Sequence, residues 1–331
     1  MQTLPWRAVR ALWRGPRRRE DRERTGPRIA VIGNCQAREI AQALRVLVPA
    51  SPVTHLPMTS LARRYGSATH LAEALAAYDH VHTQQIPPTL LEGGSEELCR
   101  LDGRIIRFPT IVFSAFHPDA VYAGGTGKPG ARDLARSPLG HYHSAIALCA
   151  YLLGLDVGRT VTLYRREVFV ALGYLDSWNA AAADLAATSR AIGFDLDEEL
   201  ARWTRRGVFM HVLNHPKIFV HADIARRLLA RSGIPPEPIA VEDYLADDLA
   251  RDVVWPIYPG VAEVYGLDGG FLFKAKPRPA VFPALYDLPG FVAASFVLYA
   301  AQGAAALACE RVDAWLGTPE IVALFEGAGS P

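Results

Sequence analysis

Apolar residues recur along this chain with two different spacings, and the change of spacing divides the sequence. Between residues 28 and 116, short apolar runs alternate with segments whose apolar positions recur every three or four residues. This pattern predicts buried strands at 28–32, 80–85 and 104–113, and amphipathic helices at 37–48 and 67–77. Strands that alternate with helices favour a small parallel sheet with helices packed on it.

The pattern changes after Pro118. Residues 120–138 are rich in Gly and Pro, which predicts a long loop. The rest is mostly helical in spacing, with helices predicted at 143–154, 165–173, 176–192, 195–206, 221–231, 241–250 and 291–316. We therefore expect an α/β protein in which a small α/β subdomain (28–118) is embedded in a mainly helical remainder (119–331), the two packed as one catalytic unit.

Residues 1–27 form a basic arm. The first 28 residues hold nine arginines and three acidic residues, although the formal net charge of the whole chain is only +1. Trp6, Val9 and Trp13 lie at helical spacing within it, so residues 1–19 are a candidate contact with a membrane surface or a partner. The alternative is a flexible leader with no role in the fold.

Composition excludes several classes of protein. The 331 residues are 50% hydrophobic and 21% charged, and a net charge of +1 predicts no nucleic-acid partner. Four widely spaced cysteines and no secretory signal are typical of a reduced, cytoplasmic protein. The uncharged segment 291–309 contains many alanines, which favours a buried helix over a membrane span.

The turn Gly33-Asn34-Cys35-Gln36 is the strongest chemical signal. It follows a predicted strand and opens a predicted helix, at the sheet edge where open α/β sheets bind ligands. The amides at a helix start favour anions and the thiolate form of a cysteine, and they can hold an oxyanion during acyl transfer. A packed structural cysteine is the alternative reading.

Three histidine motifs lie downstream: His117-Pro118-Asp119, His141-Tyr142-His143 and Asn214-His215-Pro216. A histidine close to a reactive cysteine is a candidate general base. Hydrogen bonding at a turn or a helix start is the structural alternative for each motif. His141 and His143 alone do not make a metal site, because no third ligand lies at a suitable spacing.

Basic side chains near the turn are candidate phosphate ligands. Arg38 lies one turn into the predicted helix. Lys128 ends a glycine-rich stretch that does not have the spacing of a P-loop. Either side chain can alternatively be a solvated surface charge.

Along the chain, the motifs come in the order Gly-Asn-Cys-Gln, His-Pro-Asp, His-Tyr-His-Ser and Asn-His-Pro. This series, from about residue 28 to residue 220, resembles that of the WcbI family of polysaccharide biosynthesis proteins. The resemblance implies a mainly helical, cradle-like fold that holds coenzyme A. It implies acetyl transfer to a capsular or surface polysaccharide in a bacterium. The turn also looks like the nucleophile position of SGNH-type hydrolases, with Cys35 in place of serine, so we expect an SGNH- or Rossmann-like subdomain. The basic arm departs from the family pattern.

The function that this resemblance implies for these residues is O-acetyl transfer from acetyl-CoA to a sugar hydroxyl. Cys35 would carry the acetyl group or only stabilise the oxyanion, with His117 or His143 as the base. Expected CoA ligands are Gly33, Asn34, Gln36, Arg38, Lys128, His141, Asn214 and His215, with no metal. The expected location is the cytoplasm, with contact at the inner membrane through the arm. The alternatives are a thiol esterase or deacetylase acting on a glycan, and a non-catalytic CoA- or glycan-binding assembly protein.

Overall fold

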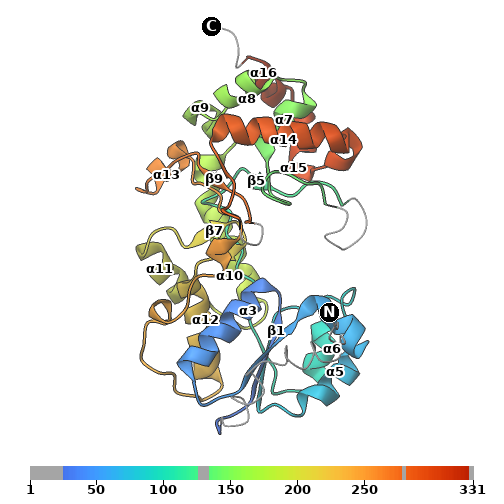
Figure 1. Ribbon diagram of the computed structural model, residues 1–331, viewed down its shortest axis with the longest axis vertical. Coiled ribbons are helices and arrows are strands. Elements are labelled where there is room, and N and C mark those ends of the chain that lie inside the picture. Colours follow the sequence, from blue (N-terminus) through green and yellow to red (C-terminus); the bar gives the residue numbers. More distant parts are fainter. Residues whose placement is uncertain (1–24, 126–133, 278–280, 328–331) are drawn as a thin grey trace, which may run out of the picture. The chain divides into compact units, whose positions relative to one another are not determined.

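The apolar run after Arg28 forms strand β1 (Ile29–Gly33), every residue of which is buried. In the computed structural model, β1 lies inside a four-stranded sheet with the order β2-β1-β3-β4 (Figure 1). The structure describes residues 25–125, 134–277 and 281–327. The predicted basic arm therefore lies almost entirely outside the described residues. Two compact units divide the chain: residues 1–109 with 221–246, and residues 110–220 with 247–331.

The sheet of the first unit is parallel throughout. β1 pairs with β2 (Val53–Pro57) on one side and with β3 (His80–Thr83) on the other, and β3 pairs with β4 (Ile106–Arg107). The register aligns Gly33 with Pro57 and Ile32 with Thr83, so the carboxyl ends of these strands lie at one edge. The strand order reverses between β1 and β3. In open α/β sheets, this reversal point is where ligands bind.

Helices cover both faces of this sheet. α3 (Cys35–Leu47) packs on β1 and β2 (Figure 1). The segment that follows α12 (Ile218–Arg231) reaches the end of α3, where the amide of Glu237 donates to the carbonyl of Leu47 at 2.8 Å. On the other face, α5 (Ala68–Leu75) and α6 (Gly94–Leu101) contribute leucines to a buried cluster with Ala30, Ile32 and Val81. A short helix α4 (Leu61–Tyr65) precedes α5. The expected α/β class and the parallel sheet are confirmed.

The second unit is mainly helical. Its described helices are α7 (Ala145–Leu152), α8 (Val157–Thr162), α9 (Arg166–Ala171), α10 (Ser177–Arg190), α11 (Asp197–Arg205), α13 (Pro259–Val264), α14 (Leu288–Gln302), α15 (Glu310–Leu316) and α16 (Pro319–Gly327). Among the residues described in this unit there are three two-stranded antiparallel sheets: β5 (Ala120–Val121) with β6 (His143–Ser144), β7 (Met210–Val212) with β8 (His215–Pro216), and β9 (Phe273–Lys274) with β10 (Leu285–Tyr286).

Several predicted elements were wrong in extent. The strand expected at 104–113 is only two residues long, Ile106–Arg107. Pro109 lies just beyond it, and it favours the end of the strand because a proline has no amide proton to donate to a neighbouring strand. The helix expected at 241–250 is two 3₁₀ turns, Val241–Asp243 and Leu249–Arg251. The helix expected at 291–316 breaks after Gln302, where Gly303 has a φ of 79°. Among the described residues, no helix is long and apolar enough to cross a membrane.

Candidate functional site

The turn between β1 and α3 is the centre of the site in the first unit. β1 ends at Gly33 and α3 begins at Cys35, so the predicted transition from strand to helix is confirmed. Asn34 is the N-cap of α3, and its Oδ1 accepts a hydrogen bond of 2.9 Å from the amide of Gln36. The cap satisfies one of the amide groups that a helix leaves open at its start.

Gln84, just beyond β3, fixes the turn from the side. Its Oε1 accepts a hydrogen bond of 2.8 Å from the amide of Asn34. The amide of Gln84 in turn donates to the carbonyl of Ile32 at 2.9 Å, and the side chain is fully buried. A Cβ at position 33 would collide with Gln84 Oε1 and lie 2.7 Å from the Cβ of Ala37. Gly33 is therefore required by close packing and not by an unusual backbone angle.

His55 on β2 is a second neighbour of the turn that sequence reasoning missed. Its Nε2 lies 3.4 Å from the carbonyl oxygen of Gly33. Burial lowers the pKa of His55, the charges of Arg38 and Arg45 lower it further, and the contact with Gly33 acts in the opposite direction. The balance favours a neutral imidazole beside the turn.

One face of the helix start is open to solvent. Asn34, Cys35 and Arg38 are exposed, whereas Gln36 is only 1% exposed. Gln36 was expected to bind a ligand, but its side chain points into the protein. Arg38 Nη2 is 3.0 Å from Glu39 Oε1, and half of the Arg38 side chain remains exposed. An exposed thiol with a guanidinium one turn away is an arrangement that suits an anionic thioester.

The His117-Pro118-Asp119 motif lies inside the second unit. Asp119 is fully buried, and its carboxylate accepts hydrogen bonds from the hydroxyls of Tyr174 (2.8 Å) and Tyr258 (2.7 Å) and from the amide of Ile146 (2.9 Å). Burial raises the pKa of Asp119, and these hydrogen bonds oppose the shift. His117 is 1% exposed, and burial lowers its pKa to about 3.

The other expected base is also enclosed. His143 is fully buried, with Nδ1 3.1 Å from the hydroxyl of Tyr299 and Nε2 3.2 Å from the carbonyl of Ala135. Burial lowers the pKa of His143 to about 4. Since neither His117 nor His143 reaches the surface, the placement of these imidazoles does not support contact with an acceptor hydroxyl.

Two of the sequence motifs meet through a tyrosine. The hydroxyl of Tyr142 donates to Asn214 Oδ1 at 2.7 Å and lies 3.4 Å from Nε2 of His215. Asn214 Nδ2 donates to the hydroxyl of Tyr122 at 2.8 Å, and Tyr122 is 39% exposed. The Asn-His-Pro motif is thus one end of a polar network that reaches solvent. The sequence pattern gave no signal for Tyr142, because its partners Asn214 and His215 lie more than 70 positions away.

His141 and Lys128 are the remaining expected ligands. His141 Nδ1 lies 3.3 Å from the carbonyl of Ala135. Lys128 falls outside the described residues. Within the described ranges, no group of three or more His, Cys, Asp or Glu residues is arranged to hold a metal ion.

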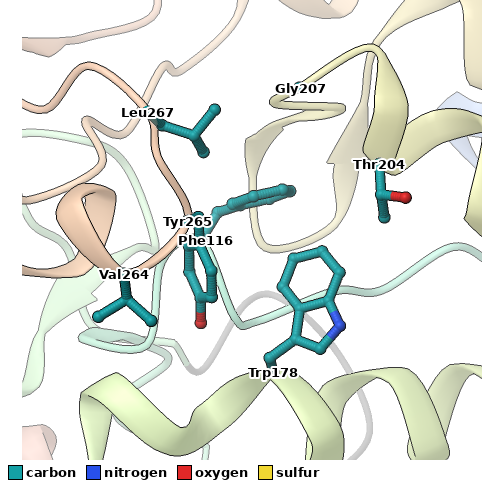
Figure 2. Close-up of a pocket in the computed structure, with 7 residues that line it drawn as sticks. All are labelled: Phe116, Trp178, Thr204, Gly207, Val264, Tyr265 and Leu267. Carbon is teal, nitrogen blue, oxygen red and sulfur yellow. The ribbon is translucent and has the colours of Figure 1, made fainter.

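The second unit also contains an aromatic pocket of about 380 Å³ (Figure 2). Phe116 and Tyr265 form its centre, and Trp178 projects from α10 toward them. The rings of Phe116 and Trp178 lie 5.7 Å apart at 76°, and those of Trp178 and Tyr265 lie 5.1 Å apart. Thr204, Gly207, Val264 and Leu267 complete the lining. Pockets of this size and character hold small organic ligands.

The chain matches a family of known proteins. The model of the family described as "Polysaccharide biosynthesis enzyme WcbI" matches residues 28–237, which include the cysteine turn and the Asn-His-Pro motif. The chain belongs to the WcbI family. No curated protein matches it.

A solved WcbI structure has the same fold. It is described as a novel polysaccharide biosynthesis enzyme, in its native form without a disulfide bond between coenzyme A and a cysteine of that protein. The match has a TM-score of 0.66 and 15% sequence identity, and it covers 92% of this chain and 99% of the other. At this identity the likeness concerns the fold.

Proposed function

We propose that this WcbI-family protein is an acetyl-CoA-dependent O-acetyltransferase that acts on a sugar of a bacterial capsular or surface polysaccharide. The exposed Cys35 carries the proposal, because it opens α3 at the sheet edge where the strand order reverses. A helix start at such a point is suited to the phosphates and the thioester of acetyl-CoA. The family match and the mention of coenzyme A for the solved WcbI structure support the same ligand.

In this function the turn has two tasks. Asn34 and Gln84 hold the backbone at the helix start, and Arg38 attracts a phosphate of the cofactor. Cys35 lies beside the acetyl thioester and takes the acetyl group as an enzyme thioester, while the CoA thiolate leaves and gains a proton. The acceptor hydroxyl then attacks that thioester, its C–S bond breaks, and the hydroxyl proton passes to the released sulfur of Cys35.

For the second unit by itself, we propose that the aromatic pocket around Phe116, Trp178 and Tyr265 binds a sugar ring of the polysaccharide. Sugar rings present C–H faces that pack on aromatic side chains, and the pocket of about 380 Å³ has room for one ring with its substituents. Trp178→Ala should weaken acetyl transfer to a polysaccharide acceptor while leaving CoA affinity unchanged. Equal loss of both would argue against an acceptor pocket.

Calorimetric titration with CoA, acetyl-CoA and 3′-dephospho-CoA tests the proposal. We expect saturable binding that weakens when the 3′-phosphate is removed. Cys35→Ala should keep binding CoA but lose acetyl transfer by at least about 100-fold. Absence of binding for all three compounds would refute the acyltransferase, and ester hydrolysis without CoA binding would favour a thiol esterase.

A further inference from the structure

The second unit has a small polar pocket next to its aromatic pocket. The polar pocket has a volume of about 190 Å³, and its polar and aromatic lining residues are Ser114, Tyr174, Ser177, Arg311 and Trp315. Ser177 directly precedes Trp178 on α10, and Ser114 lies two residues before Phe116. Since Phe116 and Trp178 line the aromatic pocket (Figure 2), the two pockets are neighbours within this unit.

Arg311 is the one charged residue among those that line the polar pocket. It lies in the first turn of α15, and its Nη1 donates a hydrogen bond to the carbonyl oxygen of Pro118. Its Nε and Nη2 make no hydrogen bond or ion pair within the part of the chain that the structure describes. These two nitrogens form one edge of the guanidinium, and that edge is free to bind a ligand.

Ser114 adds a hydroxyl to the same pocket. Burial alternates along residues 110–114: Ile111 and Phe113 are buried, whereas Thr110, Val112 and Ser114 are not. This alternation is typical of an extended segment with one face in the core, so Ser114 belongs to the open face. Its hydroxyl makes no hydrogen bond with any residue in the described ranges. A ligand in the pocket can therefore accept a hydrogen bond from it.

Aromatic rings form one side of the polar pocket. The rings of Tyr174 and Trp315 lie 6.3 Å apart at 41°, and Trp315 is only 8% exposed. The hydroxyl of Tyr174 already donates to Asp119, so its ring is fixed. Rings exclude water from one side of the pocket, and a charge-assisted hydrogen bond is stronger where water is excluded.

We propose that the polar pocket binds a carboxylate, so that the sugar recognised by the second unit is an acidic sugar of the uronic acid class. The inference rests on the function proposed above and names its substrate class. The free edge of Arg311 can make two parallel hydrogen bonds to a carboxylate, and a single positive charge matches a monoanion. Consecutive residues lie about 3.8 Å apart, so a carboxylate one bond from a sugar ring can reach past Ser177 while the ring packs on Trp178.

A structural clip is one competing explanation, because Arg311 also fixes the carbonyl of Pro118 beside the buried Asp119. Arg311→Gln separates the two roles, since an amide can still donate to that carbonyl but carries no charge. Arg311→Lys keeps the charge and loses the planar edge. Arg251→Gln is the matched control, because Arg251 lies in the same unit, is 72% exposed and pairs with Asp248 at 3.3 Å.

The assay is ligand-observed NMR titration with the methyl glycosides of glucuronic acid and galacturonic acid. The methyl ester of each sugar is the uncharged probe of nearly the same shape. We expect the wild-type protein to bind at least one acid about tenfold tighter than its ester at low salt, and to prefer it less at high salt. Arg311→Gln should bind acid and ester equally and keep the wild-type unfolding temperature. Arg311→Lys should keep part of the preference, and Arg251→Gln all of it.

The proposal would be overturned if the wild-type protein bound neither acid, if it bound acid and ester equally, or if Arg311→Gln kept the preference. Failure of both Arg311 variants to fold would assign the clip and overturn it as well. A phosphate of CoA is the other competing ligand, and loss of CoA affinity in Arg311→Gln, measured by calorimetry, would assign the pocket to the cofactor.

The same samples separate this proposal from the acetyltransferase. A wild-type protein that prefers the acid but does not bind CoA would end the acetyltransferase proposal and leave the carboxylate site standing. A wild-type protein that binds CoA without any preference for the acid would do the reverse. Trp178→Ala should weaken binding of acid and ester by the same factor, because it removes a ring contact and leaves Arg311 in place.

Discussion

The helices α3 and α7 both begin at polar side chains that cap their amides, yet only α3 begins at an exposed site. At α3, the capping Asn34 and the adjacent Cys35 are exposed. At α7, Asp119 and Ser144 accept hydrogen bonds from the amides of Ile146 (2.9 Å) and Ala147 (3.0 Å), and both side chains are fully buried. Side chains therefore cap a helix start at a candidate ligand site in the first unit and inside the core of the second unit.

Tyrosine side chains enclose the polar groups at the start of α7. The hydroxyls of Tyr174 and Tyr258 donate to Asp119, and the hydroxyl of Tyr164 lies 2.5 Å from Ser144 Oγ. Cys35, by contrast, is exposed. Residue type alone therefore does not make a motif residue a candidate for catalysis or ligand binding. Its side chain must also be accessible to a ligand.

The largest expected effect is on stability at α7. Asp119→Ala removes the acceptor of two buried hydroxyls and one amide, so we expect it to lower the free energy of unfolding by about 3 kcal/mol or more. Cys35→Ala, at the open helix start, should change it by less than about 0.5 kcal/mol. Urea unfolding at pH 7 measures both. Similar effects for the two substitutions would remove the distinction between a sealed and an open helix start.

Buried histidines should make the protein sensitive to acid. Burial lowers the pKa of His82 and His117 to about 3 and that of His143 to about 4. An unfolded histidine titrates near 6.5, so their contribution is complete above that pH and is lost as the pH falls toward these values. Each should remove about 2 kcal/mol of unfolding free energy between pH 6.5 and pH 5.

His82→Leu tests this directly by urea unfolding at the two pH values. Neither ring nitrogen of His82 has a hydrogen-bond partner among the described residues, so leucine should be tolerated at pH 7. The variant should show a smaller loss of stability on acidification than wild type. An unchanged loss would mean that His82 does not gain a proton on unfolding.

The support of the open turn should matter less for stability than the buried cap of α7 does. Gln84→Ala removes the acceptor of the Asn34 amide, and we expect it to cost about 1–2 kcal/mol of unfolding free energy and to weaken CoA binding about tenfold. Gln85→Ala is the matched control, because Gln85 is the adjacent glutamine and is exposed. If both variants bind CoA like wild type in calorimetry, Gln84 does not shape the site.

We expect the smallest effect on CoA binding from the removal of a surface charge. Arg38→Ala should weaken CoA binding about three- to fivefold at low salt and less at high salt, because half of its side chain is solvated. Arg100→Ala is the control, since Arg100 is exposed on α6 and pairs with Glu97 at 3.6 Å. Equal behaviour of the two variants would remove Arg38 from the phosphate site.

The sequence predicted the turn but not its neighbours. β1 and the start of α3 follow from a local apolar run and a helical spacing, so Cys35 could be placed correctly. β2 was missed because Thr54 and His55 interrupt its apolar pattern, and His55 was missed with it. Tyr142 and Asn214 meet across 72 positions, and no local pattern encodes such a contact. The burial of His117 and His143 is likewise a result of tertiary packing.

The central claim is that the turn at Cys35 holds coenzyme A, and protection from alkylation tests it most directly. The rate of iodoacetamide labelling at each cysteine is followed by peptide mass spectrometry, with and without saturating CoA. Cys99 is the internal reference, because it is partly exposed and lies on α6. We expect CoA to slow labelling of Cys35 at least about tenfold and to leave Cys99 unchanged. An equal Cys35 rate with and without CoA would contradict the claim.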